Sequence, residues 1–74
     1  MILQITREVN GQEEEQLIDG VSDVVTTKDN LTYVEKDKTF QKIIFDDSWK
    51  EENRMMNIYL LNDEGKTIKR IYNK

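Results

Sequence analysis

The residues of this chain that could do chemistry are carboxylates, and they gather at two places in the sequence. They are Glu13, Glu14, Glu15, Asp46, Asp47, Glu51 and Glu52. One interpretation is a surface that imitates nucleic-acid phosphates, as small acidic proteins of phages and mobile elements do when they occupy the basic groove of a nuclease or repressor. The alternative is a solvated loop or exposed strand edge at the first place, where charge prevents aggregation, and helix capping at the second.

Catalysis by these carboxylates would need more than their adjacency in the sequence. An acid–base pair requires a pocket and a pKa shifted by burial, and a domain of 74 residues rarely encloses such a pocket. Histidine and cysteine are both absent, which removes the usual ligand sets for zinc, iron and copper and the usual general base and nucleophiles. A carboxylate site for a hard cation has no EF-hand spacing to support it. We therefore predict a protein without catalytic residues, metal or cofactor.

The basic residues near the C-terminus form a second candidate site. Residues 1–64 hold 15 acidic and 7 basic side chains, whereas residues 65–74 hold four basic side chains and no acidic one. The four are Lys66, Lys69, Arg70 and Lys74. With Tyr59 and Tyr72 nearby, this tip has the composition of an RNA or single-stranded DNA site, in which aromatic rings stack on bases and cations contact phosphates.

The stretch from residue 57 to residue 72 predicts a β-hairpin and must position these groups. Its turn, residues 62–65, ends in Gly65, which suits the positive φ of a three-residue loop. The expected pairs are Leu61 with Thr67, Leu60 with Ile68, Tyr59 with Lys69, Ile58 with Arg70, Asn57 with Ile71 and Met56 with Tyr72. In this register Lys69 lies on the face of Tyr59 and Arg70 on the face of Tyr72, so the basic groups divide between the two faces.

Both faces of the hairpin are partly apolar. The better core face consists of Met56, Ile58, Leu60, Ile68, Arg70 and Tyr72. The other face carries Tyr59, Leu61 and Ile71, which we regard as a candidate protein-contact patch because aromatic and aliphatic side chains form the centres of interfaces. Extra packing within a small barrel is the alternative for the same three residues.

The rest of the chain also alternates in the manner of strands. We expect strands over residues 1–9, 21–27, 31–36 and 39–45, with Ile43, Ile44 and Phe45 in the central core strand. Residues 12–18 pair back on the first strand through the Asn10-Gly11 turn, or form a short helix over 13–18.

Two further turns are expected between these strands. Asp29-Asn30 supplies a two-residue turn that sets Thr27 opposite Thr32, Thr26 opposite Tyr33 and Val25 opposite Val34. Residues 36–38 supply the next turn.

One segment has helical rather than strand-like chemistry. Ser48 and Glu51 have the spacing of a capping box, and Asp46 and Asp47 suit a helix N-terminus. A helix from Trp49 to about residue 54 is stable only when docked, and Trp49 is the expected anchor.

These elements predict a single mainly β domain over residues 1–74. The expected fold is a small antiparallel meander or SH3-like open barrel of five to six strands, with one short helical turn near residues 48–54. The layout resembles SH3-like barrels in its early acidic loop and its helical turn before the last strands, but the ligand-binding aromatic residues of that family are not evident. No signal peptide or membrane span is visible, so we expect a native start at Met1, a cytoplasmic location and no membrane contact.

The expected function is that of a small non-catalytic interaction domain. Its partner is another protein or a second copy of the chain, and the alternative is a nucleic-acid-related protein, acting as a phosphate mimic or through the basic tip.

Overall fold

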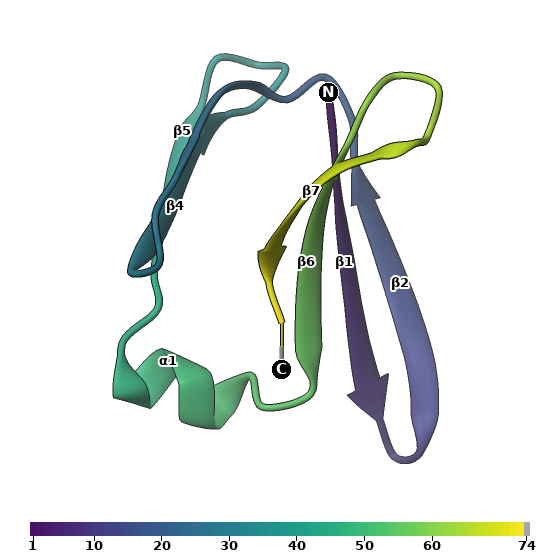
Figure 1. The fold of residues 1–74 in the computed structure, drawn as a ribbon, viewed down its shortest axis with the longest axis vertical. Coiled ribbons are helices and arrows are strands. Elements are labelled where there is room, and N and C mark those ends of the chain that lie inside the picture. The colour runs from purple at the N-terminus through teal and green to yellow at the C-terminus, as the bar shows by residue number, and fades with distance from the viewer. Residues whose placement is uncertain (74) are drawn as a thin grey trace.

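The computed structural model describes residues 1–73 and contains seven strands and one helix (Figure 1). In chain order they are β1 (Ile2–Val9), β2 (Gln12–Ile18), β3 (Ser22–Thr26), β4 (Asn30–Val34), β5 (Phe40–Ile44), α1 (Asp47–Glu52), β6 (Met56–Leu61) and β7 (Thr67–Tyr72). The mainly β, antiparallel fold predicted from the sequence is confirmed, with a short helix before the last hairpin. The count exceeds five to six because residues 12–18 form a complete strand opposite β1.

The strands divide into two sheets that face each other, with α1 at one end of the space between them (Figure 1). The first sheet has the order β2-β1-β6-β7 and the second has the order β3-β4-β5. All pairs are antiparallel. The pairing of β1 with β6 joins segments separated by more than forty positions in the sequence, so the first sheet is not a simple meander.

The core lies between the two sheets. It is built from the inward side chains of both sheets and of the segments that join them: Leu3, Ile5, Val21, Leu31, Tyr33, Phe45, Met56, Ile58 and Leu60. Three aromatic rings close one end, because Trp49 of α1 lies 4.9 Å from Phe45 and 4.8 Å from Tyr72 between ring centroids. Trp49 therefore anchors the helix as predicted, and Tyr72 joins it from the opposite sheet.

The β1–β2 hairpin forms as its turn sequence predicts. Asn10 and Gly11 have φ values of 52° and 79°, which a two-residue turn of type I′ requires at both central positions. Val9 pairs with Gln12, and the register continues without interruption to Leu3 and Ile18.

The β3–β4 turn lies one residue earlier than predicted. Thr27 N–H donates to the carbonyl of Asn30, and the Thr27 hydroxyl accepts from the backbone N–H groups of Asp29 and Asn30. The turn is therefore held by a threonine side chain and needs no residue at positive φ. As a result Thr26 pairs with Leu31 and Val25 with Thr32, which corrects the expected register by two positions. The turn at residues 36–38 forms as expected, with Lys38 at a φ of 71°.

The β6–β7 hairpin begins in the predicted register and then departs from it. Leu61 pairs with Thr67, but two irregularities shift the later pairs to Leu60 with Lys69, Tyr59 with Arg70 and Ile58 with Tyr72. Each bulge places two residues of β7 opposite one of β6, which alternation alone does not reveal. Ile68, expected on the core face, is consequently exposed.

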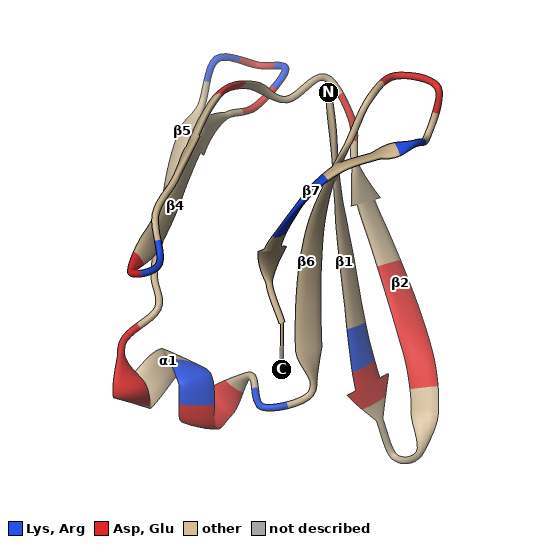
Figure 2. Cartoon of the chain, in the orientation of Figure 1, with Lys and Arg blue, Asp and Glu red and all other residues tan. Residues whose placement is uncertain are grey.

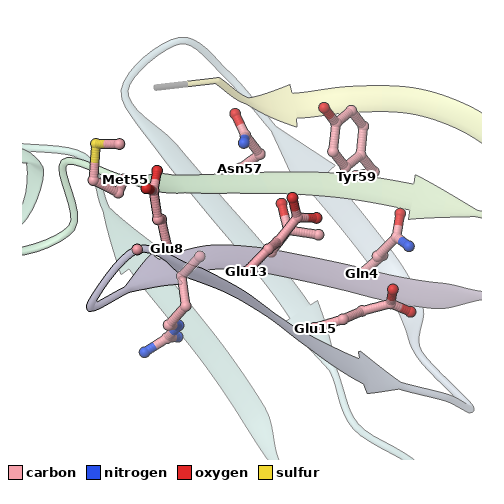
Figure 3. Close-up of a pocket in the computed structure, with 10 residues that line it drawn as sticks. Gln4, Glu8, Glu13, Glu15, Met55, Asn57 and Tyr59 are labelled. Atoms are coloured by element: carbon pink, nitrogen blue, oxygen red, sulfur yellow. The ribbon is translucent and has the colours of Figure 1, made fainter.

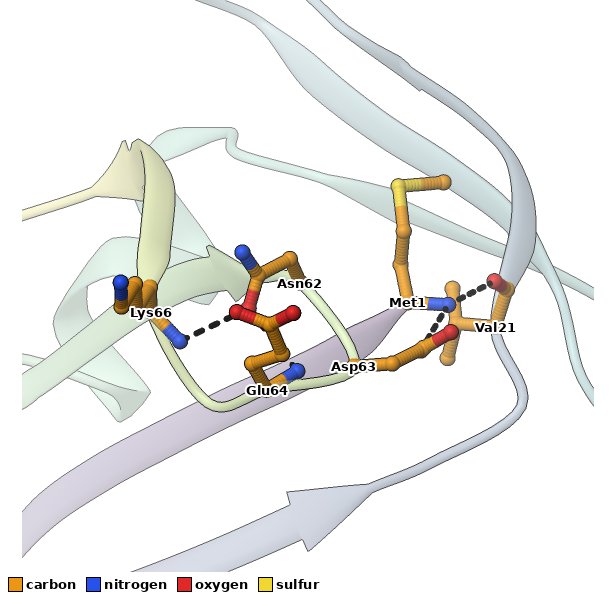
Figure 4. Close-up of polar contacts among 6 residues, drawn as sticks. All are labelled: Met1, Val21, Asn62, Asp63, Glu64 and Lys66. Atoms are coloured by element: carbon orange, nitrogen blue, oxygen red, sulfur yellow. Dashed lines mark hydrogen bonds and ion pairs between the residues drawn. The ribbon is translucent and has the colours of Figure 1, made fainter.

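The turn of this hairpin is ordered by Asn62 (Figure 4). Its side-chain oxygen accepts hydrogen bonds from Glu64 N–H and Lys66 N–H, both at 2.9 Å, and Gly65 has a φ of 85°. Next to the turn, the amino group of Met1 donates to the Val21 carbonyl at 3.0 Å and lies 3.2 Å from Asp63 Oδ1. These contacts hold the turn beside the start of β1.

Helix α1 begins earlier than its expected capping box. Asp46 is the N-cap, with extended backbone and Oδ1 accepting from Trp49 N–H at 2.9 Å, while Ser48 lies inside the first turn. The predicted role of Ser48 and Glu51 as a capping box is therefore wrong. A carboxylate at this position also interacts favourably with the positive end of the helix. Asn53 ends the helix by donating from its backbone and side chain to the Trp49 carbonyl.

The prediction for residues 39–45 is also corrected. β5 is an edge strand and β4 occupies the centre of its sheet. Phe45 is buried and Ile43 is partly buried, but Ile44 and Phe40 are exposed. The run of three apolar residues follows strand alternation, so only alternate side chains can reach the core.

Candidate functional site

The outer face of the four-stranded sheet is polar and carries a shallow hollow of about 580 Å³ (Figure 3). Three strands contribute its lining, which includes Gln4, Thr6, Glu13, Glu15, Asn57 and Tyr59. Glu15 lies opposite Thr6, and Thr6 lies opposite Asn57, so one row crosses β2, β1 and β6. Glu8 is opposite Glu13 in a second row and adds a third carboxylate.

The structure divides the seven predicted acidic residues instead of gathering them. Glu13 and Glu15 line the outer hollow, whereas Glu14 lies on the other side of β2, opposite Arg7. The four from the second group lie in or beside α1, at a distance from β2 along the lower end of the molecule (Figure 2). Glu51 and Glu52 border a different hollow, which Arg7 and Arg54 also line. The acidic surface is thus two separate groups, and Arg7 lines the hollows beside both of them.

Across residues 1–73, no group of three or more aspartate or glutamate side chains is placed to hold a metal ion. The clear pKa shifts occur at two other places. Burial, reinforced by the charge of Glu35, raises the pKa of Tyr33, and hydrogen bonds from Thr39 lower the pKa of Asp37 in the 36–38 turn. Both groups belong to the core or a turn, so the shifts have structural causes.

The basic tip is exposed but divided. Lys66, Lys69 and Arg70 are all exposed, and Lys74 lies outside the described residues. The bulges place Arg70 opposite Tyr59 and Lys69 opposite Leu60, which reverses the expected pairing. Arg70 therefore lies opposite Tyr59 on the outer face of the sheet, and Lys66 lies in the turn.

The predicted protein-contact residues do not form one patch. Leu61 is only 6% exposed, and Ile71 is partly buried against the core. Tyr59 is partly buried and lines the polar hollow on the outer face. These three side chains thus lie in three different surroundings.

Three of the exposed large apolar side chains lie on the other sheet. The outer face of the three-stranded sheet carries Val25, Phe40 and Ile44, which are 59%, 64% and 54% exposed, together with the partly buried Val34. Val34 is opposite Phe40, and Val25 is opposite Thr32, so β3, β4 and β5 all contribute. We call Val25, Val34, Phe40 and Ile44 the outer apolar face.

Sequence reasoning missed this face although the signal was present. Phe40 and Ile44 are four residues apart, so they share one side of a strand, and Phe45 lies on the other side. Because Ile43, Ile44 and Phe45 are consecutive, the run was interpreted as core without separating its two sides. Lys42, between Phe40 and Ile44 on the same side, was the residue that could have identified the exposed side.

No family model, curated protein or solved structure matches this chain. Among the described residues, no helix has the length and apolar character needed to span a bilayer.

Proposed function

We propose that this chain is a small non-catalytic interaction domain that binds protein through its outer apolar face. The observation that carries the proposal is the exposure of Phe40, Ile44 and Val25 on one side of the three-stranded sheet. Single exposed apolar residues are normal on a surface, whereas several on one face of a sheet are a candidate interaction site. Here Phe40 and Val34 form one cross-strand pair, and Lys42 and Thr32 lie between that pair and Ile44.

The energetic argument favours burial of this face against a partner. Phe40 and Ile44 each keep more than half of their side-chain surface in water. Covering them gains about 25 cal/mol for each Å² of apolar surface removed from water, or about 1 kcal/mol or more for each side chain. The aromatic ring of Phe40 is the candidate centre of the contact, because aromatic residues are enriched at the centres of interfaces.

The test compares the proteins that are captured by the wild type and by variants of two different exposed surfaces. The double variant Phe40→Ser with Ile44→Ser removes two exposed side chains of the outer apolar face, and Ile68→Ser on β7 is the control, since Ile68 is 54% exposed, as Ile44 is. Cross-linking of the tagged domain in an extract of its source cells, with quantitative mass spectrometry, should give proteins captured by the wild type and Ile68→Ser but not by the double variant. Capture that persists in the double variant would contradict the proposal.

A stability control accompanies this test. Because the substituted side chains are exposed, each serine should change the free energy of unfolding by no more than about 0.5 kcal/mol. Urea unfolding of all variants therefore separates loss of binding from loss of fold.

A second candidate function is imitation of nucleic-acid phosphates by the polar hollow. The supporting observation is that Glu8, Glu13 and Glu15 all line it. Glu13→Gln with Glu15→Gln should then abolish salt-sensitive capture of nucleic-acid-binding proteins, while Glu14→Gln on the opposite side should not. A gel shift with single-stranded DNA or RNA, lost when Lys66, Lys69 and Arg70 are replaced, would instead favour the basic tip.

A further inference from the structure

The two sheets have four open edges: bulges interrupt two of them, β2 is regular but acidic, and β5 is regular and largely apolar. β3 contains an irregularity between Ser22 and Val25, with Asp23 at a φ of 52°. β7 contains two irregularities in its pairing with β6. β2 carries three consecutive glutamates. Bulges prevent edge pairing, whereas the glutamates of β2 oppose pairing with another acidic strand and leave the edge open to a strand that carries a cation.

β5 is the exception among these edges. Its register with β4 runs from Phe40 to Ile44 without a shift, and Lys42 is its one charged residue. Two exposed apolar side chains, Phe40 and Ile44, flank that lysine on the outer side. A regular, largely apolar edge strand is a ready template for an additional strand.

The hydrogen bonds at both ends of β5 show which backbone groups face this open edge. Phe45 N–H donates to the Asp29 carbonyl, and Glu35 N–H donates to the Thr39 carbonyl, so odd-numbered residues of β5 point toward β4. Because backbone groups alternate along an antiparallel strand, Phe40, Lys42 and Ile44 direct theirs outward. Within residues 1–73, β5 pairs with no strand other than β4.

The edge of β2 presents the opposite charge. The two-residue turn makes Val9 and Gln12 a hydrogen-bonded pair, so the even-numbered residues of β2 point toward β1. Glu13, Glu15 and Leu17 therefore direct their backbone groups outward, and Leu17 is 57% exposed. β2 and β5 lie on opposite flanks of the molecule, so one copy offers both edges at once (Figure 1).

We propose that the β5 edge of one molecule pairs antiparallel with the β2 edge of a second copy. The proposed register matches apolar and oppositely charged side chains. It sets Phe40 opposite Leu17, Lys42 opposite Glu15 and Ile44 opposite Glu13. It joins one apolar pair and one pair of opposite charges, both of which stabilise antiparallel strands. The inference rests on the proposed protein-binding function and names its partner as another copy of the chain.

Charge disfavours the symmetric alternatives. Pairing β5 with itself over its full length sets Lys42 opposite Lys42, and pairing β2 with itself sets glutamates opposite glutamates, and like charges directly opposite are destabilising. The heterologous pairing leaves one free β2 edge and one free β5 edge on every assembly. It therefore extends into chains of increasing length unless the rotation closes a ring.

Sedimentation of the purified chain with a charge-swap series tests this pairing. From about 10 µM to about 1 mM, the range of weak association, the weight-average mass of the wild type should rise above that of the monomer. Lys42→Glu and Glu15→Lys should each remain monomeric, because each sets like charges opposite each other. The double variant Lys42→Glu with Glu15→Lys restores opposite charges and should associate again.

Each other outcome overturns the proposal. A wild type that stays monomeric at the highest concentration excludes the pairing, as does association of either single variant at the wild-type level. A double variant that fails to associate excludes Lys42 and Glu15 as partners. The failure of this inference is distinguishable from failure of the proposed function, because a monomeric chain can still capture other proteins in a manner that depends on Phe40 and Ile44.

Discussion

The outer faces of the two sheets differ in chemistry although their inner faces build one core. On the four-stranded sheet, the outward side chains include Gln4, Thr6 and Glu15, and they surround a shallow polar hollow. On the three-stranded sheet, the outward side chains include Phe40 and Ile44. An antiparallel sheet normally keeps one polar face toward water. The first sheet follows this rule and the second departs from it, so the second is where we expect contact with protein.

The edges of the two sheets differ in the same way. Bulges interrupt β7 in one sheet and β3 in the other, so each sheet keeps one regular edge strand. The regular edge of the four-stranded sheet, β2, is acidic, whereas β5 of the three-stranded sheet is largely apolar with one lysine.

The largest expected effect tests whether the two sheets share one core. Leu31 of the three-stranded sheet and Ile58 of the four-stranded sheet are both fully buried. Leu31→Ala and Ile58→Ala should each lower the free energy of unfolding by about 2–5 kcal/mol, through lost burial and the cavity that remains. Urea unfolding followed by Trp49 fluorescence and by circular dichroism should give coincident transitions for both variants. Two separate transitions would show that the sheets unfold independently and do not share one core.

A smaller effect is expected at the helix that connects the sheets. Asp46→Ala removes the side chain that accepts from Trp49 N–H and should cost about 1 kcal/mol. Ser48→Ala is the matched control, with an expected change within about 0.5 kcal/mol, because Ser48 is exposed inside the first turn. Urea unfolding distinguishes the two variants. A larger loss of unfolding free energy for Ser48→Ala than for Asp46→Ala would show that Ser48, and not Asp46, is the N-cap.

The smallest effect concerns pH and the inner face of the three-stranded sheet. Burial, with a contribution from Glu35, raises the pKa of Tyr33 above its ordinary value of 10.0. The folded state therefore holds the phenolic proton more tightly than the unfolded state, so the stability contribution is complete below pH 10 and is lost as the pH rises through the folded pKa. Tyr33→Phe should lose less stability than the wild type between about pH 9 and about pH 11 in urea unfolding. Equal losses would show that Tyr33 does not titrate differently on folding.

Local sequence patterns predicted the turns and strands wherever the conformation depends on residues that are neighbours in the sequence. Asn10 and Gly11 form the expected turn, and Gly65 closes the expected loop, because positive φ is readily adopted by asparagine and glycine. The β3–β4 turn was displaced because the Thr27 hydroxyl stabilises a different turn from the one that Asp29-Asn30 favours.

The candidate sites were less predictable than the elements. Tyr59, Leu61 and Ile71 are grouped by an uninterrupted alternation, whereas the bulges in β7 remove Ile71 from the position opposite Asn57 and Leu61 is buried. The outer apolar face was missed because membership of a core depends on what covers each side of a strand. The one local indication is Lys42, which lies between Phe40 and Ile44 on the same side of the strand.

The sequence by itself determined the strands, most of their turns, the position of the helix and the absence of histidine and cysteine chemistry. These features depend on the conformational preferences of neighbouring residues and on the alternation of side chains along a strand. Only the tertiary structure decided that β1 pairs with β6, that β5 is an edge and that the outward residues Phe40 and Ile44 remain exposed. The physical reason is that strand order depends on which backbone groups find partners far away along the chain, and no local pattern records that choice.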